Sequence, residues 1–218
     1  EQASAPVHGF RGESGPTESR FPRTLTIAVS RETGARGGTI ARHVGRKLGW
    51  QVVDQELMEF LAQQGKTTDD LSPAARVWSD DRLAQLQQSG AVSTDPAMAS
   101  LARVVLALAA TGEVILLGRG AGHILPPETT LHVRVVAPEA DRVAYFAQWL
   151  RLTDDQASEQ VRLRDSHRTG LLSKHMKVDP ADPYAYDLIV NSSSLGEELC
   201  SDLIVEAARA KMNFERDV

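Results

Sequence analysis

Short apolar segments alternate with longer amphipathic segments along most of the chain. The short runs are β-branched or leucine-rich and predict buried strands at Thr24–Ser30, Gln51–Asp54, Glu113–Gly118, Leu131–Ala137 and Asp187–Ser193. Between them, apolar residues recur at helical spacing, as Ile40, Val44 and Leu48 do after the first strand. About five strands that alternate with helices imply parallel strands joined by helical crossovers. The pattern therefore predicts an α/β fold with a three-layer α/β/α core.

The expected helices differ in how polar they are. Helices are predicted at 37–49, 55–64, about 73–88, 96–111, 138–152, 153–173 and 195–212. The stretch 65–96 is polar and uneven, which predicts an insertion over one face of the sheet. In open α/β sheets, ligands bind at the carboxyl ends of the strands. We therefore expect functional residues just after Ser30, Val53, Gly118, Ala137 and Asn191.

Composition and charge narrow the classes of function. The chain has 218 residues, of which 42% are hydrophobic and 24% charged, so residues 24–218 suit one domain with a small insertion. Residues 1–23 are rich in proline and glycine and predict a disordered tail without a secretory signal. The net charge of −5 argues against general binding to nucleic acids. The longest apolar run, Val104–Ala110, is too short to span a membrane.

The single cysteine, Cys200, excludes an intrachain disulfide and a cysteine-based metal cluster. A chain with one thiol fits a reducing compartment, so we expect a cytoplasmic location. The histidines lack the spacing of metal ligands, so no zinc site is predicted. The sequence does not determine the oligomeric state, and a homo-oligomer is one of the states left open.

A glycine-rich turn, Ser30–Ala41, joins the first strand to the first helix. Its glycines allow backbone amides to point inward, and a helix N-terminus behind them carries partial positive charge. We expect a phosphate cradle whose binding residues are Arg31, Thr33, Gly34, Ala35, Gly37, Gly38 and Thr39. Arg36 would add charge, and Thr39 could also bind Mg²⁺. No Lys follows a Gly here, so the turn is not a Walker A motif, and an ordinary strand-to-helix turn remains the alternative.

Several segments together resemble the cytidylate kinase-like family of P-loop nucleoside monophosphate kinases. The segments are "VSRETGARGGTIA" at the first turn, "GWQVVDQEL" at Gly49–Leu57, "GRGA" at Gly118–Ala121, "VRVVAPEADRV", the Asp165–Arg168 pair and "YDLIVNSSSL" at Tyr186–Leu195. The resemblance extends over Thr24–Met212. It implies a P-loop kinase core with a monophosphate-binding insertion at about 55–96 and a lid at about 153–176.

The resemblance also implies a reaction. Relatives with demonstrated chemistry transfer the γ-phosphoryl group of ATP, with Mg²⁺, to a pyrimidine monophosphate, so the expected partners are ATP and a CMP-like or dCMP-like acceptor. Gly34 matches a loop glycine, and Arg36 replaces the last one. Gly37 stands where the relatives carry the Walker Lys, and Gly38 where they carry its Ser or Thr. Arg36 is the expected substitute for that Lys.

Other residues take acceptor and lid roles through the same resemblance. Asp54 matches the acidic residue that opens the monophosphate region, and Arg119 matches an arginine on the acceptor phosphate. Asp165 matches the residue that holds the acceptor ribose, and Arg168 matches a phosphate-binding lid residue. The relatives' "GRD" is "GRG" here, so Gly120 lacks an acceptor-facing carboxylate.

Structural roles compete with each of these assignments. Arg119 could form a salt bridge with Asp54 or Glu32 instead, and Asp54 could simply cap the following helix. Arg164 and Arg168 lie four residues apart, on one helix face, where they could close over the transferred phosphoryl group. Alternatively, they belong to a solvated face.

Three functions remain open from the sequence. The first is a nucleoside monophosphate kinase with Arg36, Arg164 and Arg168 as catalytic residues. The second is a nucleotide-binding regulatory module that has lost kinase activity, because the loop lacks its Lys. The third is a scaffold domain without a ligand.

Overall fold

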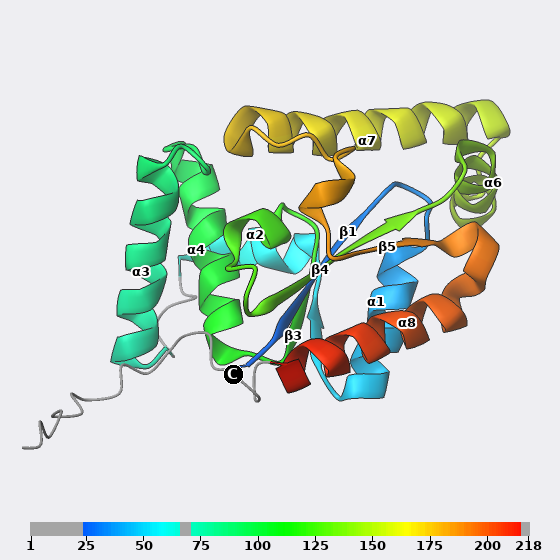
Figure 1. Cartoon of the computed structure of the whole chain (residues 1–218). Helices are drawn as coiled ribbons and strands as arrows, with labels where there is room; N and C mark the ends of the chain where they lie inside the picture. The colour runs from blue at the N-terminus through cyan, green and yellow to red at the C-terminus, as the bar shows by residue number, and fades with distance from the viewer. Residues whose placement is uncertain (1–23, 66–70, 215–218) are drawn as a thin grey trace, which may run out of the picture.

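The central strand β1 (Thr26–Arg31) is fully buried from Thr26 to Val29 and becomes half-buried only at its carboxyl end. It pairs in parallel with β3 (Val114–Leu117) on one side and with β4 (Thr130–Val136) on the other. The strands β2 (Gln51–Val53) and β5 (Leu188–Asn191) complete a five-stranded sheet in the order β2-β3-β1-β4-β5 (Figure 1). Every pairing is parallel, which confirms the predicted α/β fold.

The structure is a computed structural model and describes residues 24–65 and 71–214. The predicted tail, 1–23, and part of the predicted insertion lie outside these residues. The described helices are α1 (Gly37–Leu48), α2 (Gln55–Gln64), α3 (Pro73–Gln88), α4 (Pro96–Thr111), α5 (Ala121–Ile124), α6 (Glu139–Leu150), α7 (Asp154–Met176), the 3₁₀ turn η1 (Pro183–Ala185) and α8 (Ser192–Phe214).

Side chains that alternate along β1 enter two separate cores. Ile27 and Val29 pack with α1 and α8 on one face of the sheet. Ala28 belongs to the second core, on the other face, where α2, α3, α4 and the end of α7 gather. Both faces of the sheet are therefore covered, which confirms the three-layer arrangement and explains why the strands are continuously apolar.

Local signals set most helix boundaries where the sequence predicts them. Asp54 accepts the amide of Leu57 and so caps α2, while Asp95 caps α4 in front of a proline. Thr153 and Gln156 form a capping box at the start of α7. The prediction missed α5 and η1, which are too short to show periodicity. Helix α8 begins at Ser192, earlier than predicted, and Gly196 interrupts it with a positive φ.

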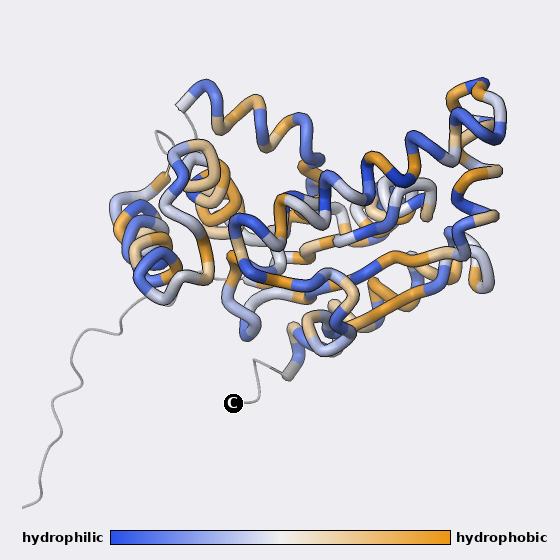
Figure 2. The backbone as a smooth tube through the Cα atoms, turned by 90° about the horizontal axis from the view of Figure 1, so that it is seen from above, coloured by the Kyte–Doolittle hydropathy of each residue, from blue (hydrophilic) through white to orange (hydrophobic). Residues whose placement is uncertain are grey.

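The segment predicted as a lid is one long helix, α7, which lies across the top of the molecule in Figure 1. Seen from above, α7 crosses over the other layers, and most of its own residues are hydrophilic (Figure 2). Its C-terminal end reaches the core through Leu172 and Met176, and His175 bonds to Ser93 through both its ring and its carbonyl oxygen. This end of α7 is therefore part of the packed core.

Candidate functional site

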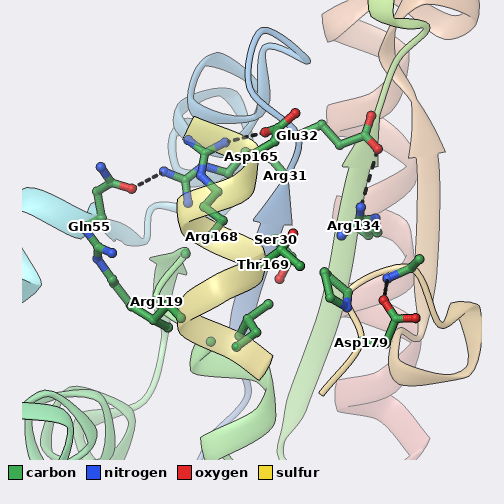
Figure 3. Close-up of a pocket in the computed structure, with 16 residues that line it drawn as sticks. Ser30, Arg31, Glu32, Gln55, Arg119, Arg134, Asp165, Arg168, Thr169 and Asp179 are labelled. Carbon is green, nitrogen blue, oxygen red and sulfur yellow. Dashed lines mark hydrogen bonds and ion pairs between the residues drawn. The ribbon is translucent and has the colours of Figure 1, made fainter. Parts of the chain in front are cut away.

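A cavity of about 340 Å³ lies at the carboxyl ends of the central strands, beneath α7 (Figure 3). Its lining comes from segments far apart in the sequence: Ser30, Arg31, Glu32, Gln55, Gly118, Arg119, Gly120, Arg134, Asp165, Arg168, Thr169, Leu171, Leu172, Asp179, Pro180 and Ala181. The cavity thus occupies the sheet edge at which α/β proteins bind ligands. Four of the lining residues are arginines, and three others, Glu32, Asp165 and Asp179, carry carboxylates.

Arg31 is the most unusual of these arginines. Its side chain leaves the end of β1 and crosses over Gly118, where any Cβ would collide with the guanidinium. It donates to the side-chain oxygen of Gln55 at 2.9 Å. Burial and the nearby charges of Arg168 and Arg119 lower the pKa of Arg31 from 12.5 to about 9. Within residues 24–65 and 71–214, no carboxylate lies within 4.0 Å of this guanidinium.

Arg119 projects from a turn of unusual backbone geometry. Gly118, Arg119 and Gly120 all have positive φ, and the value of 56° at Arg119 costs about 1 kcal/mol or more for a residue with a side chain. The guanidinium forms an ion pair with Glu59 of α2, rather than with Asp54 or Glu32 as the sequence alternative held. Among the residues that the structure describes, its buried Nε atom has no hydrogen-bond partner. A ligand that accepts this hydrogen bond would satisfy it.

Arg168 and Asp165 come from α7 and connect it to the first loop. Asp165 accepts the amide of Thr33 at 2.8 Å and its hydroxyl at 2.7 Å, and Arg142 at 2.7 Å. Arg168 donates to the Thr33 hydroxyl at 2.6 Å and to Asp165 at 3.3 Å. Burial is the main cause that lowers the pKa of Arg168. Both residues line the cavity together with Arg119, and their membership of a functional site stays a prediction.

Other predicted residues lie outside the cavity lining. Arg36 stacks over the ring of Tyr145 at 4.9 Å and approaches Glu197 of α8 at 3.8 Å. Arg164 lies over the ring of Phe146 at 5.0 Å, although it was expected beside Arg168. Asp54 caps α2, which is the structural alternative stated for it.

The glycine-rich turn forms the predicted strand-to-helix connection, but parts of it are bonded within the protein. The amide of Thr33 is held by Asp165, and that of Ala35 by the carbonyl of Glu32. Gly34 lies so close to the backbone of Arg142 that a Cβ would collide with its carbonyl. Ser192 donates to the carbonyl of Ala35 at 2.9 Å.

The remaining predicted cradle residues begin α1. Gly37, Gly38 and Thr39 form its first turn, whose amides have no partner inside the helix. These amides are the part of the turn that keeps the predicted geometry for an anion. Thr39 accepts only a long bond of 3.4 Å from Arg42, so its hydroxyl remains suited to a ligand.

The sequence did not point to three of the polar residues at this site. Arg134 and Gln55 line the cavity, and His132 bonds to the cavity residue Ser30 at 3.1 Å. The alternation in "LHVRVVA" was a usable signal, because two polar residues two apart in a buried strand share one face. That face of β4 points to the cavity side.

Comparisons with known proteins give a family and proteins of similar structure. The sequence profile of the Cytidylate kinase-like family matches residues 26–194. An uncharacterized protein from Eubacterium ventriosum has a similar structure, with a TM-score of 0.61 and 14% identity, covering 86% of this chain and 99% of that one. A shikimate kinase from Acinetobacter baumannii gives a TM-score of 0.47 at 12% identity, covering 88% and 97%.

One curated protein matches part of the chain. A uronate isomerase from Corynebacterium glutamicum is 32% identical over 98 residues, which are 44% of this chain and 19% of the isomerase. This chain therefore spans only about a fifth of the length of that relative. None of the described helices combines the length and the apolar run that a bilayer crossing needs.

Proposed function

Because the chain belongs to the cytidylate kinase-like family, we propose that it transfers the γ-phosphoryl group of ATP to a nucleoside monophosphate, with CMP or dCMP as the preferred acceptor. One observation carries the proposal: the half-buried side chain of Arg31 lies near Arg119 and Arg168 without a carboxylate partner in the part of the chain described. Burying a charge is costly unless something pairs with it. A phosphate group is an anion of suitable size and geometry for such a cluster.

In this proposal, different residues bind the acceptor phosphate and the phosphates of ATP. Arg31, Arg119 and Arg168 bind the acceptor phosphate and stabilise the negative charge of the transferred group. Phosphoryl transfer depends mainly on such positioning and charge stabilisation. The ATP phosphates lie against the first turn of α1, at Gly37, Gly38 and Thr39, whose amides point toward the helix N-terminus. In this scheme Arg31, not Arg36, supplies the charge that the Walker Lys supplies in relatives.

Asp165 takes a role other than the one the resemblance implies. Its two oxygens are already occupied by Thr33, Arg142 and Arg168. We infer that Asp165 aligns Arg168 and fastens α7 to the loop, and that it does not need to bind the acceptor ribose. Arg164 and Arg36 would have to leave their aromatic neighbours to reach a phosphate.

Mg²⁺ accompanies ATP in this family, and the residues around the loop fit it only in part. Glu32 is engaged by Arg134, Arg142 and the amide of Ala137, and Asp165 is engaged as described. In residues 24–65 and 71–214, no group of three or more potential ligands gathers. The hydroxyl of Thr39 would hold the ion, with the nucleotide phosphates as its other ligands. When bound, Mg²⁺ neutralises phosphate charge.

A coupled ADP-release assay with Mg-ATP and a panel of nucleoside monophosphates tests the proposal. We expect turnover that is highest with CMP or dCMP and falls about 10²-fold or more in Arg119→Ala, because a preorganised donor is lost. Arg103→Ala is the matched control, since Arg103 lies on the surface of α4 and pairs there with Asp80 of α3. Turnover that is unchanged in Arg119→Ala would remove this residue from the acceptor site.

A second function has its own supporting observation. The amides of Thr33 and Ala35 are bonded within the protein, so they do not donate to a triphosphate bound in the loop. A regulatory module that binds a nucleotide in the arginine cavity without transferring phosphate would show this feature. It predicts that CMP raises the melting temperature while no acceptor supports ADP release.

A further inference from the structure

We propose that Ser30 is a nucleophile that accepts a phosphoryl group, with His132 as its general base. This inference deepens the proposed function, because it rests on the cavity being a phosphate site. Ser30 lines the cavity, and its Oγ lies 3.1 Å from Nε2 of His132. A hydroxyl within hydrogen-bond reach of an imidazole is the first requirement for an activated serine.

The imidazole reaches Ser30 through Nε2, so a general base at this position needs the tautomer in which Nδ1 carries the ring proton. In that tautomer Nε2 accepts, and the Ser30 hydroxyl donates to it. The proton of Ser30 is thereby directed at the base, and the lone pairs of Oγ are free to face the cavity.

Packing holds the imidazole in this position. The ring of His132 lies 4.9 Å from that of His123 and 4.6 Å from that of Tyr186, measured between centroids. Gly122 leaves the space that the ring fills, since a Cβ there would collide with it. Burial and His123 lower the pKa of His132 to about 4, so the imidazole is neutral at pH 7 but is a weak base. An anion bound nearby raises that pKa and strengthens the base.

The cavity selects the class of reagent. Arg31, Arg134 and Arg168 line the same cavity as Ser30 and can stabilise the charge on a phosphoryl group. The substrate class is therefore an acyl phosphate or a nucleoside triphosphate. The hydroxyl proton moves to Nε2, an Oγ–P bond forms, and the bond from phosphorus to the bridging oxygen breaks. The electron pair leaves on that oxygen, as a carboxylate or a nucleoside diphosphate.

The test treats the full chain with acetyl phosphate, and separately with Mg-ATP, and follows intact mass and peptide maps. We expect one added phosphoryl group, located on Ser30, and none in Ser30→Ala. His132→Gln should slow the modification about 10²-fold or more, because it removes the base. Inorganic phosphate should slow it in the unaltered protein by competing for the arginines, a result that does not depend on a variant that folds.

A second Ser–His pair provides the matched control. Ser93 Oγ lies 2.8 Å from Nδ1 of His175, but neither residue lines the cavity. Ser93→Ala should therefore leave the modification of Ser30 unchanged. Equal modification of Ser93 and Ser30, no phosphoryl group on Ser30 with either reagent, or an unchanged rate in a folded His132→Gln would each overturn the inference.

The outcome can be separated from that of the proposed function. If CMP is phosphorylated but Ser30 is never modified, the kinase proposal stands and the nucleophile is refuted. If acetyl phosphate modifies Ser30 but no monophosphate supports ADP release, the nucleophile stands and the kinase proposal fails.

Discussion

Replacing Asp165 with Asn should loosen α7 from the loop and destabilise the protein. The carboxylate accepts the amide and hydroxyl of Thr33 at 2.8 and 2.7 Å, and Arg142 at 2.7 Å. The Arg142 side chain is only 11% exposed, so it would be left buried without its carboxylate partner from α7. Hydrogen bonds to charged groups contribute about 1.5–3 kcal/mol each, and breaking a fully buried ion pair costs about 3–5 kcal/mol.

Solvent reduces the expected cost. The Asp165 side chain is 30% exposed, Asn can still accept one hydrogen bond, and Glu32 remains near Arg142 at 3.5 Å. We therefore expect a loss of about 2–3 kcal/mol. For a domain of this size, this lowers the melting temperature by roughly 4–12 °C.

Calorimetry on the unaltered protein and on Asp165→Asn provides the measurement, with hydrogen exchange at the Thr33 amide as a local readout. Asp202→Asn is the control, because Asp202 pairs with Lys47 at an exposed position and such pairs contribute at most about 1 kcal/mol. Equal melting temperatures for Asp165→Asn and the unaltered protein, with Thr33 exchange unchanged, would refute the reasoning.

Three further predictions concern the same elements. The pKa of His132 is lowered from 6.5 to about 4, so the unfolded chain binds a proton there between these pH values and the folded chain does not. The free energy of unfolding is therefore unaffected by this group above about pH 6.5 and falls by up to about 3 kcal/mol as the pH drops to 4. Urea unfolding of His132→Gln should lack this dependence on pH. Gly34→Ala should destabilise by at least about 2 kcal/mol in urea unfolding, because Gly34 has φ 83° and faces the carbonyl of Arg142. Gly120→Asp, which restores the relatives' residue, should also destabilise, because φ is 70° and the Cβ would press on Met176; a melting temperature at or above that of the unaltered protein would contradict this.

The sequence predicts most of the fold because its signals are local. The Asp54 carboxylate caps the N-terminus of α2, and Gly65 ends the helix in the left-handed conformation. Each of these signals acts within one turn of the helix end. The strands can be predicted because helices cover both faces of a parallel sheet, so its strands are continuous apolar runs. Short elements such as α5, with four residues, have no period to detect.

The site was harder to predict because its contacts span long stretches of sequence. Arg31 and Arg36 both belong to the glycine-rich turn, and periodicity cannot tell which one faces the sheet edge. Only the fold shows that Arg31 crosses Gly118, while Arg36 lies on Tyr145. Likewise, Asp165 and Thr33 are 132 residues apart, and their bond depends on where α7 lies over the loop.

The central claim is that the arginine cavity binds the phosphate of an acceptor nucleotide through Arg31. Isothermal titration of CMP into the unaltered protein and into Arg31→Gln tests it most directly, because Gln keeps a donor but removes the charge. We predict an affinity at least about tenfold weaker in the variant, with a smaller dependence on salt. Equal affinities at low and high salt would contradict the account.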